Sequence, residues 1–191
     1  MDYTAAVITV SDKGSQGLRE DTSGPALVKM LEENGFTVVE TGIIPDDYEQ
    51  IRGTLIRLAD ETKVCLALTT GGTGFSHRDV TPEATMSVVE RPAPGIPEAM
   101  RAFSLTITPR AALSREAAGL RGDTVIVNLP GSRKASTENL SAVLDSLKHG
   151  IDILRGRDAD CGEEHHHHDG HHHDGHHHGD HHHGEEHHHH G

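Results

Sequence analysis

Along residues 1–157, short runs of apolar residues alternate with longer stretches in which apolar residues recur every three or four positions. The apolar runs at 5–10, 36–44, 64–69 and 124–129 predict strands, because each is short and bounded by turn residues. Strands that alternate with helical stretches are typical of β-α-β units. The pattern therefore predicts an α/β fold, a three-layer sandwich with a mostly parallel central sheet.

Helical stretches fill the intervals between these runs. Four are predicted: one opening at Ser23 and ended by Gly35, one with the spacing Tyr48, Ile51, Leu55 and Leu58, one opening at Thr81 and broken by residues 91–95, and one with the inner face Leu140, Val143, Leu144 and Leu147. Two further short helices are predicted around residues 98–105 and 111–118, and residues 11–22 are predicted as turn and loop.

The composition divides the chain in two. Residues 158–191 carry 17 of the 19 histidines, 9 of the 30 acidic residues and none of the 17 lysines and arginines. The remaining 157 residues hold 21 acids and 17 bases, a formal charge of −4 instead of the −13 of the whole chain. The sequence therefore predicts one folded domain over residues 1–157 and a tail of different character over residues 158–191.

Several functional classes are excluded by what the sequence lacks. No apolar run approaches the roughly 18 residues of a membrane span, and the N-terminus has no secretory signal pattern, so we expect a cytoplasmic protein without a membrane partner. Cys65 and Cys161 are too few for a disulfide framework. An acidic chain with 3% aromatic residues and no Trp lacks the basic stripe and the stacking rings that nucleic-acid binding needs.

Three loops follow the ends of predicted strands, at residues 45–47, 71–79 and 130–132. In open parallel sheets, ligands bind in the crevice outside the carboxyl ends of the strands, so we expect these loops to converge on one pocket. The first strand ends at Ser11 and Asp12, for which the same rule makes ligand contact one interpretation and an ordinary turn the other.

The loop after the third strand consists of Thr70, Gly71, Gly72, Thr73 and Gly74. Glycines turn without a Cβ clash and let successive backbone N–H groups point at one anion, which favours phosphate binding. The loop lacks the Gly-Lys-Ser/Thr ending of a Walker loop and the spacing of dinucleotide-binding folds. A plain tight turn between a strand and a helix explains the glycines equally well.

Asp46 and Asp79 lie in two different strand-end loops and form the candidate catalytic pair. Mg²⁺ takes one or two carboxylates together with phosphate oxygens and waters, and this pair could supply the carboxylates. Taken singly, Asp46 also fits a helix cap. Asp79 also fits an ion-pair partner of Arg78, or a cap for the helix that opens at Thr81.

Basic side chains near the same loops could bind phosphate, and Arg78, Arg133 and Lys134 are the candidates. Solvated surface side chains are the alternative for all three. His77 is a single histidine in a loop, which fits either a general base or a hydrogen-bonded surface residue.

Five short motifs lie in and around these loops: Val-Ser-Asp at 10–12, Ile-Pro-Asp at 44–46, Thr-Thr-Gly-Gly-Thr-Gly-Phe at 69–75, Arg-Asp-Val-Thr-Pro-Glu-Ala at 78–84 and Asn-Leu-Pro-Gly-Ser at 128–132. Together they resemble the molybdopterin adenylyltransferase family of molybdenum cofactor synthesis. The resemblance runs from about residue 4 to residue 155, which is nearly the whole predicted domain.

The resemblance implies a three-layer α/β domain that forms a homo-oligomer, commonly a trimer and sometimes a hexamer. It implies a reaction in which ATP, with Mg²⁺ as cofactor, transfers AMP to the terminal phosphate of molybdopterin. The products are pyrophosphate and adenylyl-molybdopterin, which a metal-insertion protein would take up. Position by position, Asp46 and Asp79 match the family's functional acids, residues 71–74 match its phosphate-and-pterin loop, and Pro130, Gly131 and Ser132 match its second pocket loop.

Two positions depart from the commonest pattern of that family. His77 and Arg133 stand where many relatives have proline, which leaves both acids in place and bears on the stiffness of the two loops. Because the superfamily includes proteins that bind pterin without adenylating it, the alternative function is a non-catalytic pterin-binding or metal-buffering protein on the same fold.

From His165 onward the tail contains only His, Asp, Glu and Gly, with the histidines in runs of three or four. Such a segment has nothing to bury and is predicted to be disordered without metal, whereas its histidines could converge on Ni²⁺, Zn²⁺ or Cu²⁺. An expression tag is the alternative, although tags are usually one uninterrupted run. The candidate ligands are His165, His166, His167, His168, His171, His172, His173, His176, His177, His178, His181, His182, His183, His187, His188, His189 and His190.

Overall fold

The computed structural model describes residues 3–156. Its strands are β1 (Tyr3–Val10), β2 (Phe36–Ile44), β3 (Leu66–Thr70), β4 (Arg91–Pro92), β5 (Ala118–Arg121) and β6 (Thr124–Leu129). Its helices are α1 (Asp12–Ser15), α2 (Ser23–Glu33), α3 (Tyr48–Arg57), α4 (Thr81–Val88), α5 (Gly95–Leu105) and α6 (Arg133–Leu154). A π-helical turn, η1 (Leu58–Thr62), continues α3, and a 3₁₀ turn, η2 (Pro109–Leu113), follows α5.

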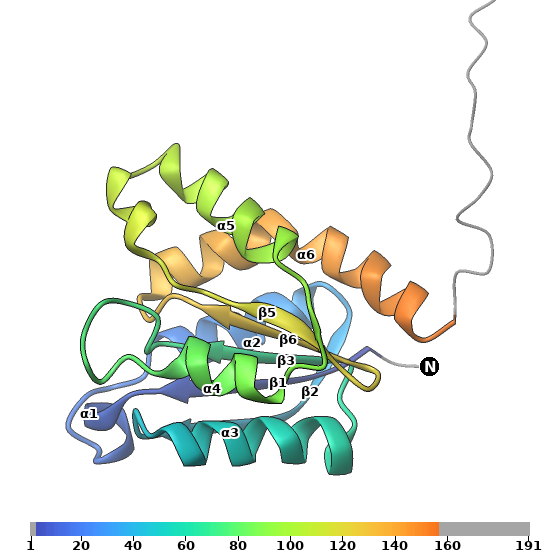
Figure 1. Ribbon diagram of the computed structural model, residues 1–191, viewed down its shortest axis with the longest axis horizontal. Coiled ribbons are helices and arrows are strands. Elements are labelled where there is room, and N and C mark those ends of the chain that lie inside the picture. Colours follow the sequence, from blue (N-terminus) through green and yellow to red (C-terminus); the bar gives the residue numbers. More distant parts are fainter. Residues whose placement is uncertain (1–2, 157–191) are drawn as a thin grey trace, which may run out of the picture. The chain divides into compact units, whose positions relative to one another are not determined.

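The six strands form one mixed sheet with the order β2-β1-β3-β6-β5-β4. The first four in this order are parallel to one another, while β5 runs antiparallel to β6 and β4 runs antiparallel to β5. Helices cover both faces, with α5 and α6 on one side and α3 and α4 on the other (Figure 1). The predicted fold class, a three-layer α/β sandwich with a mostly parallel sheet, is confirmed.

Each face of the sheet has its own apolar core. Side chains of α2, α5 and α6 pack on one face, where Leu27, Met100 and Leu140 are fully buried. Side chains of α3 and α4 pack on the other face, where Ile51 and Leu55 are buried. Strands β1, β3 and β6 are covered from both sides, which explains why they are continuous apolar runs in the sequence instead of alternating patterns.

Two expectations for local structure are wrong. Residues 111–118 do not form a helix, because Pro109 opens a single 3₁₀ turn and Ala118 then begins β5. Strand β5 connects to the antiparallel strand β6 through a turn at Gly122. The φ of Gly122 is +52°, which residues with a Cβ rarely adopt. The segment predicted as turn and loop after β1 contains the one-turn helix α1, which Ser11 caps by accepting a hydrogen bond from the N–H of Gly14 at 3.0 Å.

The strand register decides where the loops leave the sheet. Thr9 pairs with Thr70, and Thr70 pairs with Leu129, so β1, β3 and β6 end at neighbouring positions on the same edge. The loops that follow these three strands therefore start side by side. This edge lies at the point where the strand order reverses on the two sides of β1, which is the usual ligand crevice of such sheets.

No helix among residues 3–156 is both long and apolar enough to cross a membrane. The predicted disorder and metal binding of the histidine-rich tail concern residues that lie outside the described part of the chain.

Asn128 provides a test of the sheet's polar interior. Its buried side-chain amide donates to the hydroxyls of Thr69 at 3.0 Å and Thr85 at 2.8 Å, and its oxygen accepts from the N–H of Ala117 at 3.3 Å. Asn128→Leu leaves these groups without partners in the core, so the free energy of unfolding measured with urea should fall by about 2–4 kcal/mol. Asn34→Leu, at an exposed helix end, should cost less than about 1 kcal/mol, and equal losses would contradict this account.

Candidate functional site

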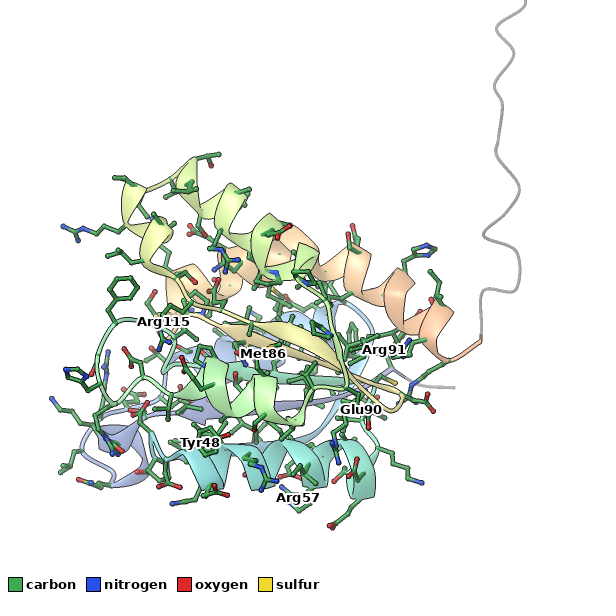
Figure 2. All side chains as sticks on the ribbon, in the orientation of Figure 1. Tyr48, Arg57, Met86, Glu90, Arg91 and Arg115 are labelled. Atoms are coloured by element: carbon green, nitrogen blue, oxygen red, sulfur yellow. The ribbon has the colours of Figure 1, made fainter. Side chains whose placement is uncertain are left out.

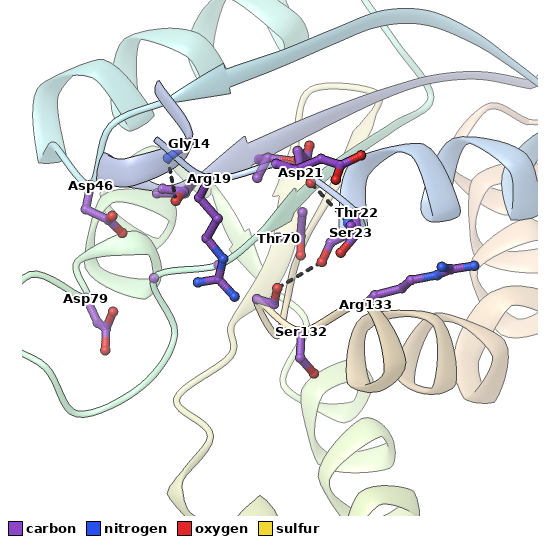
Figure 3. A pocket seen from close by; sticks show the side chains of 17 residues that line it. Gly14, Arg19, Asp21, Thr22, Ser23, Asp46, Thr70, Asp79, Ser132 and Arg133 are labelled. Atoms are coloured by element: carbon purple, nitrogen blue, oxygen red, sulfur yellow. Dashed lines mark hydrogen bonds between the residues drawn. The ribbon is translucent and has the colours of Figure 1, made fainter. Parts of the chain in front are cut away.

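A cavity of about 460 Å³ opens at the carboxyl edge of the sheet. Its walls come from the end of β1, the segment before α2, the loop after β2, the glycine loop after β3 and the start of α6, at residues 9–11, 14, 19–23, 46, 70–72, 79 and 131–133 (Figure 3). Four regions that are far apart in the sequence, at residues 9–23, 46, 70–79 and 131–133, therefore meet around one space.

The structure brings many of the candidate residues from the sequence to this cavity. Those that line it are Ser11, Asp46, Thr70, Gly71, Gly72, Asp79, Gly131 and Ser132. Those that lie behind or beside the lining are Asp12, Thr73, Gly74, Arg78, Pro130 and Lys134. The two acids and the first two glycines of the loop thus share one cavity, whereas two of the three basic candidates do not contact it.

Close backbone approach explains two of the glycines. Gly71 has a φ of +108°, and a Cβ there would collide with the carbonyl oxygen of Val10 at the end of β1. A Cβ at Gly131 would lie 3.2 Å from the Cα of Gly71. The end of β1, the glycine loop and the loop after β6 can pack this tightly only because neither position carries a side chain.

The other glycines of the loop make room for the two acids. A Cβ on Gly72, whose φ is +65°, would collide with Oγ1 of Thr81 and lie 3.1 Å from Oδ1 of Asp46. A Cβ on Gly74 would lie 2.9 Å from Oδ2 of Asp79. Each carboxylate therefore lies directly against a glycine of the same loop, although the acids come from loops after β2 and β3.

Asp12 positions Asp46 through a reciprocal pair of hydrogen bonds. The N–H of Asp12 donates to Oδ2 of Asp46 at 2.8 Å, and the N–H of Asp46 donates to Oδ1 of Asp12 at 3.0 Å. Arg78 also donates to both oxygens of Asp12, at 3.0 and 2.9 Å. The sequence candidates Asp12 and Arg78 therefore neutralise each other beside the cavity, and Asp46 remains directed into it.

The pKa values of Asp12 and Asp46 are shifted in opposite directions, one by an ion pair and the other mainly by burial. The Arg78 guanidinium holds the pKa of the Asp12 carboxyl below its ordinary value. Burial raises the pKa of Asp46, and the negative charges of Asp12 and Asp79 add to the effect. A partly buried carboxylate with acidic neighbours is a group that a bound cation stabilises.

Asp79 is held by the loop itself and by an arginine that the sequence did not single out. Its Oδ2 accepts from the N–H of Ser76 at 2.9 Å. Arg115 donates to the carbonyl oxygens of Gly74 at 2.7 Å and Asp79 at 2.6 Å, and it forms an ion pair with Glu83. Arg115 lies beside this loop in Figure 2, so one side chain from the segment before β5 ties both ends of the 74–79 turn together.

Sequence reasoning also missed the segment 19–23. Asp21 accepts a hydrogen bond from the hydroxyl of Thr9 at 2.6 Å and bonds from the N–H groups of Ser23 and Gly24 at 3.0 and 2.9 Å. The hydroxyl of Ser23 donates to the carbonyl of Gly131 at 2.9 Å. An acid two residues before a Ser-Gly-Pro helix start was the available signal, since such acids cap first-turn amides.

The donor set fits Mg²⁺ held jointly by protein and phosphate. Asp46 and Asp79 offer two carboxylates, and Oγ1 of Thr81, which is buried without a hydrogen-bond partner, lies against the same glycine as Asp46. Within residues 3–156, no cluster of three or more His, Cys, Asp or Glu side chains is arranged to hold a metal. Two carboxylates without a complete protein cage are what Mg²⁺ needs when phosphates and waters complete its shell.

Comparison with known proteins agrees with this geometry. The family model described as "Probable molybdopterin binding domain" matches residues 6–149. The chain belongs to this molybdopterin-binding domain family. The match includes β1 from Ala6 and every loop that lines the cavity.

Two bacterial relatives carry the name molybdopterin adenylyltransferase. The chain is 41% identical over 152 residues to the molybdopterin adenylyltransferase of Helicobacter pylori, covering 78% of this chain and 86% of that protein. It is 42% identical over 151 residues to the molybdopterin adenylyltransferase of Escherichia coli, covering 76% and 77%.

Solved structures show the same fold. The molybdopterin biosynthesis enzyme MoaB of Thermus thermophilus is 44% identical, with a TM-score of 0.77 over 81% of this chain and 97% of that chain. The tungsten cofactor synthesizing protein MoaB of Pyrococcus furiosus is 33% identical, with a TM-score of 0.74 over 81% and 98%.

Gly72→Ala should destabilise the protein beyond the effect of its backbone conformation. A residue with a Cβ is strained at this positive φ, and the added Cβ also collides with Thr81 and approaches Asp46. The free energy of unfolding measured with urea should therefore fall by about 3 kcal/mol. The matched control is Gly122→Ala, which has a similar φ of +52° and open space around the added Cβ, and should lose only about 1 kcal/mol. Equal losses would show that the close contact at Gly72 is not there.

Proposed function

We propose that this protein is a molybdopterin adenylyltransferase, which transfers AMP from Mg-ATP to the terminal phosphate of molybdopterin in molybdenum cofactor biosynthesis. The observation that carries the proposal is the placement of Asp46 and Asp79 against the glycine loop in one cavity. The names of the relatives at 41–43% identity support the same reaction.

The chemistry needs positioning more than a protein nucleophile. An oxygen of the molybdopterin phosphate forms a bond to the α-phosphorus of ATP, the bond from that phosphorus to the β-phosphate oxygen breaks, and pyrophosphate leaves with the electron pair. The attacking oxygen is already ionised near neutral pH, so no general base is required. The role of the chain is to hold two anionic substrates in line, and the glycine loop and the loop at 130–132 form the walls that do so.

The charge of the cavity explains why a divalent cation belongs to this reaction. Four carboxylates line it, those of Glu20, Asp21, Asp46 and Asp79, against the guanidiniums of Arg19 and Arg133, which gives a formal charge of −2. Polyphosphate would be repelled from such a lining. Asp46 and Asp79 would hold Mg²⁺, which supplies charge neutralisation of the phosphates and of the leaving pyrophosphate.

The proposal extends to the partners of the protein. We expect a homo-oligomer, a trimer in the first instance, and a downstream metal-insertion protein that consumes adenylyl-molybdopterin. Both expectations rest on the family resemblance. Relatives named for molybdenum and for tungsten cofactors share the fold, so the proposed adenylylation is compatible with either metal at the later step.

The two acids give the direct test. Asp46→Asn and Asp79→Asn should each lower kcat/KM for pyrophosphate release with molybdopterin and Mg-ATP by about 100-fold or more, because the cation loses a charged ligand. Binding of molybdopterin, measured by fluorescence quenching, should change by less than about threefold if the acids act mainly on the nucleotide. The matched control is Asp47→Asn, because Asp47 caps α3 by accepting from the N–H of Gln50 at 2.9 Å and asparagine caps equally well.

Unchanged turnover in both acid variants would contradict the catalytic assignment. Molybdopterin binding by the wild-type protein without any pyrophosphate release would favour the alternative, a non-catalytic pterin-binding protein on the same fold.

We further propose that the histidine-rich tail binds transition metal ions such as Ni²⁺, Zn²⁺ or Cu²⁺ in several weak, exchanging sites. The support is compositional: 17 histidines within residues 158–191, interspersed with acids and glycines. Neutral imidazole is the commonest ligand of these ions, and glycine spacing allows separate runs to reach one ion. A tail with such weak, exchanging sites would buffer or deliver metal ions.

Calorimetric titration with Ni²⁺ and Zn²⁺ tests the tail. The full chain should bind several ions at pH 7.5, and a variant ending at Arg157 should bind far fewer. Lowering the pH to 5.5 should weaken binding by the full chain about tenfold or more, because protons compete for imidazoles whose pKa is normally about 6.5. Equal stoichiometry for the two proteins would overturn the proposal.

A further inference from the structure

We infer that Arg19 binds the phosphate groups of the substrates in this cavity, a role that the family motifs do not assign to it. The inference rests on the proposed function for the identity of the ligand, and on the geometry of the cavity for the identity of the residue.

Two of the three basic residues that the sequence suggested for this role, Arg78 and Lys134, lie outside the cavity and have acidic partners. Arg78 donates to both carboxylate oxygens of Asp12 and does not line the cavity. Lys134 lies 3.9 Å from Glu138 on the same helix and is also outside the lining. Releasing Arg78 for a ligand would leave Asp12 uncompensated beside Asp46.

Arg19 lines the cavity, and its side chain forms no hydrogen bond or ion pair with any residue in the described range 3–156. In Figure 3 its side chain extends into the space between Asp46 and Thr70, whereas the side chain of Arg133 is directed along the start of α2, next to Thr22 and Ser23. Of the two guanidiniums that line the cavity, that of Arg19 therefore lies between Asp46 and Thr70, and that of Arg133 points away from the two acids.

Three backbone donors at the two neighbouring helix starts are already used. The N–H groups of Ser23 and Gly24, in the first turn of α2, donate to Asp21, and the N–H of Ala135, in the first turn of α6, donates to the hydroxyl of Ser132 at 3.2 Å. A phosphate beside these two helix starts cannot use these three N–H groups, so a side chain that reaches it adds charge that they do not supply. A guanidinium can donate two parallel hydrogen bonds to phosphate oxygens, which suits this position.

The side-chain chemistry also separates two tasks within the cavity. Asp46 and Asp79 would hold the metal ion that binds one set of phosphate oxygens. Arg19 would donate hydrogen bonds to phosphate oxygens that do not contact the metal. In adenylyl transfer, both the nucleotide and the acceptor bring phosphates to the same point, and a lining with a formal charge of −2 has few cations to offer them. Loss of Arg19 should therefore weaken every phosphate ligand and spare ligands without phosphate.

The test is equilibrium binding to the full chain, with Mg-ATP, Mg-pyrophosphate and adenosine as probes. Arg19→Met keeps most of the apolar stem and removes the charge, so it should weaken both phosphate probes by about tenfold and leave adenosine unchanged. Arg19→Lys should restore part of the loss. The matched control is Arg110→Met, since Arg110 also has no side-chain partner among the described residues and lines a separate cavity of about 280 Å³.

The outcomes separate this inference from the proposed function. Wild-type affinity of Arg19→Met for both phosphate probes would overturn the inference, as would an equal loss in Arg110→Met. If Arg19→Met loses affinity while the wild-type protein releases no pyrophosphate with molybdopterin, the phosphate-binding role stands and the proposed transferase function fails.

Discussion

The close approach of the glycine loop to the end of β1 is the constraint on which the site depends. No side chain fits between Gly71 and the carbonyl of Val10, and Gly131 packs on the same backbone. Parallel register brings the ends of β1, β3 and β6 to one edge, and the missing Cβ atoms let the loops stay in contact after they leave the sheet. The cavity is the space that remains beyond this contact.

Electrostatics then decides which groups remain available to a ligand. Three aspartates approach one another at Asp12, Asp46 and Asp79, an arrangement that is unfavourable without compensation. Arg78 neutralises Asp12, whose backbone in turn orients Asp46. The repulsion between Asp46 and Asp79 is not removed by this arrangement, and the proposed Mg²⁺ would relieve it. The same cluster thus stabilises its own geometry and leaves a charge for a ligand to satisfy.

The sequence predicted the four long strands and the main helices because their apolar periodicity is strong. It missed β5, where Gly122 and Asp123 gave a two-residue hairpin signal that the alanines at 111, 112, 117 and 118 obscured. At the site, it placed Asp46, Asp79 and the glycines at one edge, since strand-end position follows from topology alone. It named Arg78, Arg133 and Lys134 as phosphate ligands and did not consider Arg19, because the partner of an arginine is a matter of tertiary contact.

Arg115 shows that the glycine loop is not a self-contained motif. The carbonyl oxygens of Gly74 and Asp79 accept hydrogen bonds from the guanidinium of Arg115, which precedes β5 and lies 41 and 36 residues further along the chain. A graft of residues 70–83 onto another parallel sheet would carry the glycines and Asp79 but would leave those oxygens without their donor. Transplanting this loop therefore requires transplanting the antiparallel extension of the sheet as well.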